Sequence, residues 1–397
     1  MGKSVPLIYL IAGEPSGDIL GARLMAALKQ ETDGEIKFAG IGGAEMEGEG
    51  LHSLFPISDL AVMGIAEVIP RLPLLIRRIN QTVENVQNAA PSALVTIDAP
   101  DFSFRVAKRL KGKGIPLVHY VAPTVWAWRP GRAAKVAGFL DHMLTLLPFE
   151  PPYFEKEGLD STFVGHPVVE GQAMRADGNA FRQRHAISAN ETVVVALPGS
   201  REGEVSRHLP VFEQTLLQLT RSHHDLRVVV ITTSTVADTV RAATSSWAFP
   251  VLIVDDVGQK FEAMAAGNVA LAASGTVALE LAATQTPSVV TYRVNPLTAW
   301  IVKKLVNVRF ANLINLILNR EAVPERIQEE CRADVLSTEL QNLLNSPEIA
   351  DKQRQDCRDA LHTLHGEGKG GPAKLAARTV LNLIRHQPNV QNENGAG

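Results

Sequence analysis

The stretch LPGSREGE, residues 197–204, directly follows the apolar run TVVVA, which is typical of a buried strand. It brings Gly199, Ser200 and Arg201 together at the point where that strand ends. A glycine there lets backbone N–H groups approach an anion closely, and a guanidinium can bind a diphosphate through two hydrogen bonds. We therefore expect these three residues to bind a diphosphate. A plain turn with a solvent-facing arginine is the structural alternative.

A second loop of this kind lies in LAASGTVALE, residues 271–280. Ser274, Gly275 and Thr276 stand between an apolar run and a helical pattern, so a hydroxyl there can cap the helix and face a phosphate. The Glu280 carboxylate, about one turn into the helix, can accept hydrogen bonds from both hydroxyls of a ribose. An ordinary cap with a glutamate that offsets the helix dipole is the alternative. Two such loops favour a nucleoside diphosphate as the ligand.

The first half of the chain offers an acid for catalysis. Asp98 follows the apolar run ALVTI and therefore stands at the end of a predicted strand, where it can act as a general base. Asp101, three residues later, competes with it for the role of helix cap. If Asp101 caps the helix, Asp98 is free for chemistry; an Asp98 that caps the helix or holds a turn is the structural alternative.

Two further stretches place polar or aromatic residues after predicted strands. AGEPSGD contains Ser16, Gly17 and Asp18, and HYVAPTVWAWRPGR contains His119 and Trp126 in a chain of only four tryptophans. We expect these five residues in loops beside the substrate. Paired aromatic side chains suit stacking on a sugar or the packing of a loop, and packing is the simpler interpretation.

Residues 62–78, VMGIAEVIPRLPLLIRR, form an apolar segment that two prolines interrupt. The mixture is typical of a membrane-surface or acyl-chain contact, because basic residues attract an anionic leaflet while apolar side chains enter it. A helix of the protein core is the alternative. The residues expected at this contact are Val68, Ile69, Leu72, Leu75, Arg77 and Arg78.

The scaffold for these residues follows from the order of patterns along the chain. Apolar, β-rich runs alternate with helical patterns throughout, which predicts an α/β fold with parallel sheets. At 397 residues the chain exceeds the size of one core, so we expect two α/β halves around a crevice. The expected divisions are a Rossmann-like domain at 1–168, a second at 169–350, C-terminal helices at 351–386 that pack back toward the first domain, and a disordered tail at 387–397.

Composition narrows the class of function. The net charge is −3 and no basic-aromatic RNA motif occurs, so we expect no nucleic-acid partner. The two cysteines, Cys331 and Cys357, fit a reducing compartment and make the cytoplasm the default location. Metal-ligand spacings and the GxGxxG loop of dinucleotide enzymes are missing, so we expect neither a metal nor a nicotinamide cofactor. The apolar run from Val5 is too short to span a bilayer and predicts a first strand.

A series of motifs then occurs in one order: AGEPSGD, GIGG, the segment 62–78, IDAPDFSFRVAK, HYVAPTVWAWRPGR, LPFEP, VGHP, LPGSR, SGTVALE, YRVNPLTA and NLILNREAVPERIQ. Together they resemble the lipid-A-disaccharide synthase family, which consists of inverting glycosyltransferases of GT-B architecture. The resemblance runs from about Leu7 to about Gln328 and is weaker in the C-terminal helices.

The resemblance implies a transfer of 2,3-diacylglucosamine from its UDP derivative to 2,3-diacylglucosamine 1-phosphate. The products are a β-1′,6-linked disaccharide 1-phosphate, which is the lipid A precursor, and UDP. It also implies a Gram-negative bacterial enzyme that needs no cofactor and lies on the cytoplasmic face of the inner membrane as a peripheral protein. The oligomeric state, monomer or homodimer, stays open.

The same resemblance assigns roles to single positions. Asp98 matches the family's candidate base for the acceptor 6-hydroxyl, and Arg201 matches the diphosphate contact. Glu280, with Ser274 and Thr276, matches the nucleotide-binding loop.

Asn315, Glu321 and Gln328 match a late motif on the donor side. Ser103 departs from the asparagine common after DAPDF in the family, and residues 311–314 depart from a frequent Ser-Leu-Pro version. These departures concern details of acceptor contact rather than the reaction.

Two other functions fit parts of the sequence. One is a UDP-sugar 2-epimerase of the same fold. Its substrate is soluble, so this function would not explain the membrane or acyl-chain contact expected at residues 62–78. The other is a lipid-binding module without catalysis, which UDP release on mixing with both lipids would exclude.

Overall fold

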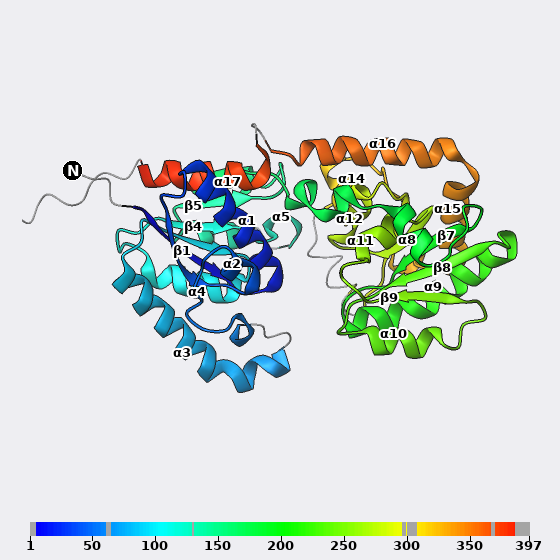
Figure 1. Cartoon of the computed structure of the whole chain (residues 1–397), viewed down its shortest axis with the longest axis horizontal. Coiled ribbons are helices and arrows are strands. Elements are labelled where there is room, and N and C mark those ends of the chain that lie inside the picture. Colours follow the sequence, from blue (N-terminus) through cyan, green and yellow to red (C-terminus); the bar gives the residue numbers. More distant parts are fainter. Residues whose placement is uncertain are drawn as a thin grey trace, which may run out of the picture. The chain divides into compact units, whose positions relative to one another are not determined.

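The computed structural model describes residues 5–60, 65–128, 131–295, 299, 308–366 and 370–385, except for the side chains of 65–70, 127 and 128. The chain forms two compact units (Figure 1). The first consists of Met1–Pro167 with His365–Gly397, and the second of Val168–Leu364. Each contains a parallel six-stranded sheet with helices on both faces, so the predicted α/β fold with two Rossmann-like domains is confirmed.

The sheet of the first unit has the strand order β2-β1-β3-β4-β5-β6. Its strands are β1 (Leu7–Ala12), β2 (Lys37–Ile41), β3 (Ala93–Ile97), β4 (Leu117–Tyr120), β5 (His142–Thr145) and β6 (Ser161–Phe163). Its helices are α1 (Pro15–Glu31), α2 (Ala44–Gly48), α3 (Ile65–Ala89), α4 (Pro100–Leu110), α5 (Val125–Trp128), α6 (Gly131–Ala137), α7 (Pro151–Glu155) and α17 (Gly371–Arg385). Helices α1 and α17 pack on one face, and α3, α4 and α6 on the other. Burial on both faces explains why the strands are continuous apolar runs.

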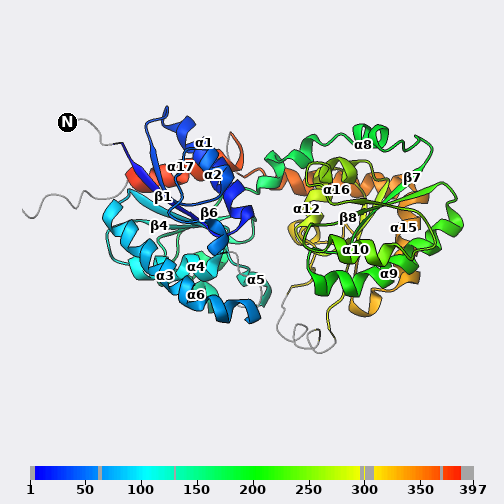
Figure 2. The same cartoon turned by 60° about the horizontal axis from the view of Figure 1, so that its bottom comes forward.

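The sheet of the second unit has the order β12-β11-β10-β7-β8-β9. Its strands are β7 (Thr192–Leu197), β8 (Leu226–Ile231), β9 (Val251–Val254), β10 (Val269–Ala273), β11 (Ser288–Tyr292) and β12 (Glu325–Ile327). Its helices are α8 (Gly178–Arg184), α9 (Glu202–Ser222), α10 (Ala237–Thr244), α11 (Lys260–Ala265), α12 (Val277–Ala283), α14 (Leu313–Leu318), α15 (Ala333–Asn345) and α16 (Pro347–Thr363). Figure 2 shows α8 and α9 on opposite sides of this sheet, where they contribute to separate apolar clusters.

Both sheets have a topological switch point beside their first strand. In the first unit, β1 lies between β2 and β3, and in the second, β7 lies between β8 and β10. Loops that leave such a pair of strands turn to opposite faces, which makes room for a ligand at the carboxyl edge of the sheet. The switch points bring AGEPSGD beside Asp98 and LPGSR beside Ser274–Thr276.

The C-terminal helices divide between the two units after residue 364, which corrects the expected grouping of 351–386. Helix α16 belongs to the second unit, where it contacts α12 and α14. Its Gln353 side chain accepts the Ser288 N–H at 2.5 Å and donates to the Ser288 C=O at 3.1 Å. Because its buried face is committed to these partners, α16 does not return to the first unit.

Helix α17, in contrast, belongs to the first unit. It lies beside α1 (Figure 1), where Arg378 pairs with Glu31 through bonds of 2.9 and 3.0 Å. The expected disordered tail, 387–397, lies outside the described residues. Within the described part of the chain, no helix is both long and apolar enough to cross a membrane.

Candidate active site

The loop after β7 surrounds a carboxylate of the protein itself. Glu204, in the first turn of α9, accepts the Ser200 N–H at 3.4 Å and the Arg201 Nη1–H at 3.1 Å. It also accepts the Tyr292 hydroxyl at 3.0 Å. The anion in this predicted anion site is therefore Glu204, which the sequence analysis did not single out.

The Glu204 contact explains the glycine of LPGSR. Gly199 has a φ of +124°, a region that other residues rarely adopt. A Cβ at this position would lie 2.9 Å from Glu204 Cβ and 3.0 Å from Glu204 Oε2. The sequence did carry a signal for Glu204: it is the third residue after the N-cap Arg201, the position from which a glutamate reaches back in a capping box.

A buried histidine fixes the backbone of this loop. His208 Nδ1 lies 2.8 Å from the Pro198 C=O, and the Arg293 N–H donates to His208 Nε2 at 3.0 Å. Nδ1 must therefore carry the proton and donate to Pro198. Burial lowers the pKa of His208, in spite of the Pro198 bond, so the ring stays neutral and bridges the exits of β7 and β11.

Loops after four strands of the second unit line one cavity of about 360 Å³. The predicted residues that line it are Gly199, Ser200, Ser274, Gly275, Thr276 and Glu280. Polar residues that were not predicted are Glu204, Thr232, Thr233, Ser234, Asp256 and Lys260. Arg201 stands outside the lining with a side chain that is 74% exposed. The two loops predicted to bind a nucleoside diphosphate thus share one cavity at the switch point.

Glu280, the predicted ribose acceptor, has a partner of its own in this cavity. Lys260 Nζ, at the start of α11, lies 2.7 Å from both carboxylate oxygens of Glu280. This pair orients the carboxylate toward the cavity and adds a positive charge to its wall. No sequence pattern marks Lys260, because only the fold brings α11 beside α12.

The three late donor-side residues, Asn315, Glu321 and Gln328, do not line this cavity. Asn315 is fully buried; its Nδ2 donates to the Val323 C=O at 2.8 Å, and its Oδ1 accepts the N–H groups of Ala322 and Val323. The Asn315 amide is committed to the turn before β12, and its expected substrate contact stays a prediction. Gln328 directly follows β12 at the carboxyl edge of the sheet, with a φ of +55°.

In the first unit, Asp98 lies at the switch point with Ser16, as predicted. Both Asp98 and Ala99 adopt left-handed backbone conformations, with φ of +51° and +44°. Asp98 Oδ1 accepts the Ala99 N–H at 2.9 Å, and Ser16 Oγ donates to Oδ2 at 3.3 Å. Gly13 allows the two loops to meet, because a Cβ there would lie 2.5 Å from the Ala99 methyl group. The carboxylate is half-buried and so remains accessible.

Asp18 and Gly17 have structural roles, which corrects their expected place beside the substrate. The buried Asp18 carboxylate accepts the N–H groups of Gly43, Glu45 and Met46 at 2.7–3.1 Å and thereby caps α2. A Cβ at Gly17 would lie 3.3 Å from the Ile97 C=O, so this glycine lets α1 approach β3.

His119 also belongs to the core rather than to a substrate loop. It lies on β4, fully buried, with Nδ1 2.7 Å from Thr96 Oγ1 and its ring against Phe104. Burial lowers its pKa to about 3, so it stays neutral. The prediction of a substrate contact for His119 is wrong because the strand extends through it.

Trp126 connects two loops at the carboxyl edge of the first sheet. Its Nε1–H donates to Glu150 Oε1 at 3.3 Å, and its ring meets Phe149 edge-on. Glu150 Oε2 accepts the N–H groups of Leu146 and Leu147. This environment favours the packing interpretation of the aromatic stretch. Burial raises the pKa of Glu150 to about 7.

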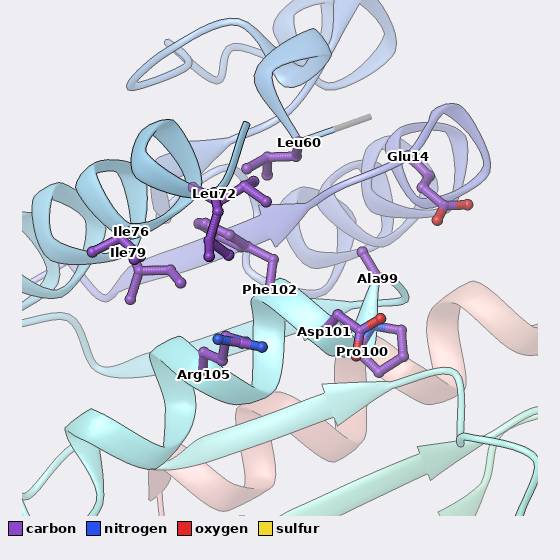
Figure 3. A pocket seen from close by; sticks show the side chains of 11 residues that line it. Glu14, Leu60, Leu72, Ile76, Ile79, Ala99, Pro100, Asp101, Phe102 and Arg105 are labelled. Carbon is purple, nitrogen blue, oxygen red and sulfur yellow. The ribbon is translucent and has the colours of Figure 1, made fainter. Parts of the chain in front are cut away.

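An apolar cavity of about 310 Å³ lies next to the loop of Asp98 (Figure 3). Its apolar walls come from Leu60, Leu72, Leu75, Ile76, Ile79 and Phe102, on α3, α4 and the chain before them. Glu14, Asp101 and Arg105 add polar groups. Neither aspartate is the N-cap of α4, which is Ala99.

Helix α3 contains residues 65–78 of the predicted membrane segment and continues through both of its prolines, and residues 62–64 lie outside the described residues. Leu72 and Ile76 are 43% and 49% exposed, and Arg77 is exposed. Arg78 is committed elsewhere: it bonds Asp59 at 2.6 and 2.8 Å and stacks on a phenylalanine ring, which corrects its expected membrane role. The side chains of Val68 and Ile69 lie outside the described residues.

Two Rossmann-like units, each built on a parallel six-stranded sheet, define the GT-B architecture. Solved structures share this fold. The complex of MnaA from S. aureus with UDP superposes with a TM-score of 0.64 at 13% identity and covers 96% of this chain and 99% of that one. A glycosyltransferase from Rickettsia africae superposes with a TM-score of 0.60 at 10% identity over 96% and 98% of the chains. At these identities the likeness shows the fold alone.

The family follows from sequence similarity along the whole chain. The lipid-A-disaccharide synthetase family profile matches residues 8–380. A lipid-A-disaccharide synthase from Rhodospirillum centenum is 52% identical over 380 residues, 95% of this chain and 94% of that protein. Another, from Paramagnetospirillum magneticum, is 47% identical over 97% and 100% of the two chains. The chain therefore belongs to the lipid-A-disaccharide synthetase family.

Membership confirms the function that the motifs implied. The protein is a glycosyltransferase of lipid A biosynthesis that uses a UDP-sugar. The epimerase alternative keeps only a distant likeness in fold, since solved UDP-N-acetylglucosamine 2-epimerases are 11–13% identical to this chain.

Proposed function

We propose that the protein transfers 2,3-diacylglucosamine from UDP-2,3-diacylglucosamine to 2,3-diacylglucosamine 1-phosphate at the inner face of the inner membrane. The reaction is a single in-line displacement. A base deprotonates the acceptor 6-hydroxyl while the anomeric carbon, oxocarbenium-like, loses UDP from its opposite face. The product is the β-1′,6-linked disaccharide 1-phosphate.

The cavity of the second unit supports a donor site. The N–H groups of the Gly199–Arg201 loop and the guanidinium of Arg201 are suited to the diphosphate, whose negative charge grows as the bond breaks. Glu280, which Lys260 orients, is suited to the ribose hydroxyls. Ser274 and Thr276 complete the polar wall.

The Asp98 loop supports an acceptor site. Ser16 holds one oxygen of Asp98, and the other is bonded to the backbone, so the carboxylate has a fixed direction. The observation that carries the proposal is the apolar cavity beside this loop, lined by Ala99 and Pro100 on one side and by α3 on the other (Figure 3). An apolar cavity next to a candidate base suits an acceptor that bears acyl chains, whereas a soluble sugar nucleotide has no use for it.

Exposed apolar residues on α3 support membrane association. Leu72 and Ile76 are exposed, and Arg71 and Arg77 lie exposed on the same helix. This combination is suited to an anionic lipid surface.

A product assay tests the proposal. The purified protein is incubated with UDP-2,3-diacylglucosamine and the acceptor lipid, with UDP-N-acetylglucosamine as the unacylated control donor, and products are identified by mass spectrometry. We expect one disaccharide 1-phosphate per UDP released, little product from the control donor, and the same rate in the presence of a chelator. UDP release without disaccharide, or an epimerised sugar, would contradict the proposal.

Sedimentation of the same sample distinguishes a monomer of 42.9 kDa from a homodimer.

A further inference from the structure

Glu204 places a negative charge inside the cavity proposed for the donor diphosphate. It lines that cavity with Gly199 and Ser200, and its side chain is only 13% exposed. Its oxygens accept the Ser200 N–H and the Arg201 guanidinium, which are the donors proposed for the phosphates. A carboxylate and a diphosphate compete for the same donors and repel each other, so both cannot occupy them together.

The surroundings of Glu204 allow it to release these donors without collapse of the loop. Its second anchor is the Tyr292 hydroxyl, which comes from the end of β11 rather than from the loop. The loop backbone is held separately, since His208 bonds Pro198 on one side and Arg293 on the other. The loop therefore keeps its shape whether or not Glu204 holds Ser200.

We propose that Glu204 is a displaceable substitute for the diphosphate of the donor. It holds the Ser200 N–H and Arg201 in the unliganded enzyme, yields them when the diphosphate binds, and takes them back when UDP leaves. The inference rests on the proposed function, which places the diphosphate at LPGSR. Its consequence is that Glu204 weakens UDP binding and thereby favours release of this product.

A glutamate that acts only as a helix cap predicts the opposite result. In that case, loss of Glu204 loosens the loop and weakens UDP binding. The substitution Glu204→Gln separates the two roles, because glutamine keeps the capping geometry and the bond to Tyr292 but removes the charge.

The test is calorimetric titration of the full chain with UDP. We expect the Kd for UDP to fall by about three- to tenfold in Glu204→Gln, as the removal of one partly screened charge suggests. The KM for the UDP-sugar should fall in parallel, with no gain in kcat. Glu202→Gln is the matched control: it removes the same charge from the same helix end, but Glu202 is exposed, bonds Thr239 and does not line the cavity. Its Kd should stay within about twofold of wild type.

An unchanged or raised Kd in Glu204→Gln overturns this inference alone. If Glu204→Gln does not fold, Glu204→Ala serves instead: tighter UDP binding supports the charge effect and weaker binding overturns it. Failure of the wild-type protein to bind UDP overturns the proposed function and this inference with it.

Discussion

At the scale of single residues, the candidate base is held by a strained backbone. Two consecutive left-handed residues, Asp98 and Ala99, cost about 1–3 kcal/mol each and persist only where the surroundings enforce them. Here the Asp98 N–H donates to the Tyr120 C=O, and Ser103 Oγ donates to the Asp98 C=O at 3.0 Å. Ser103, which departs from the family's asparagine, thus holds the backbone behind the carboxylate.

Replacement of Asp98 tests its role as the base. We expect Asp98→Asn to lower kcat by roughly 10²- to 10⁴-fold, because an amide cannot accept the hydroxyl proton. UDP affinity and melting temperature should stay unchanged. Asp33→Asn, which removes an exposed carboxylate of the same unit that does not line the apolar cavity beside Asp98, is the control and should keep most of the rate. If Asp98→Asn also keeps most of its rate, the base is a different group.

Replacement of Arg201 tests the diphosphate contact. We expect Arg201→Ala to lower turnover by on the order of 10²- to 10³-fold, because the guanidinium compensates charge on the leaving diphosphate. Its side chain is exposed, so the fold should not suffer. Arg184→Ala, which removes an exposed ion pair elsewhere in the same unit, is the control. Near-normal turnover of Arg201→Ala would reject this contact.

At the scale of elements, the loops after β4 and β5 are joined through a buried carboxyl group. Burial raises the pKa of Glu150 to about 7, against 4.5 when unperturbed. Between these pH values the folded protein keeps a proton that the unfolded chain has lost. This contribution to stability is therefore present below about pH 4.5 and is lost as the pH rises to about 7.

Glu150→Gln removes this titration. We expect the melting temperature of wild type minus that of Glu150→Gln to be largest near pH 4.5 and to shrink toward pH 7.5. Because both proteins contain the same buried histidines, the difference between their melting temperatures reports the titration of Glu150 alone. Thermal melts followed by circular dichroism across this range provide the measurement. A difference that stays constant with pH would show that Glu150 does not titrate there.

Helix α3 can be tested as the lipid-facing element. We expect Leu72→Ser with Ile76→Ser to lower flotation with anionic vesicles by about tenfold or more, because each change removes an exposed apolar side chain. Ile349→Ser, at a residue of α16 that is 50% exposed, is the matched control. Undiminished flotation of the α3 variant would place the membrane contact elsewhere.

At the scale of the whole molecule, both sheets could be predicted from the sequence, because a strand buried on both faces is a continuous apolar run. Chain order also placed Asp98 and the two donor loops at strand ends, where parallel topology gathers them. Lys260 was missed because its role depends on a neighbour that only the folded chain supplies, whereas the capping-box position of Glu204 was a signal that the sequence analysis did not use. His119 was misassigned because the sequence of a motif does not show whether a polar residue faces a ligand or the protein core.

The division of the chain leads to a prediction about fragments. All residues that line the donor cavity lie between 197 and 280, within the second unit. We expect the fragment 168–364 to fold and to bind UDP within about tenfold of the full chain. The fragment 1–167 lacks α17 and exposes the apolar face of α1, so it should unfold without cooperativity. Cooperative melting of 1–167 alone would show that α17 is dispensable.

The late arrival of α17 has a consequence for synthesis on the ribosome. The sheet of the first unit is complete once β6 has emerged, yet α17, one of the two helices that cover one of its faces, is translated only after the second unit. Throughout that interval the nascent chain carries an uncovered apolar surface, while the inserted unit can already mature. Domains usually mature from the amino terminus onward, and here the order is reversed. Chaperone dependence should accordingly concentrate in the first unit.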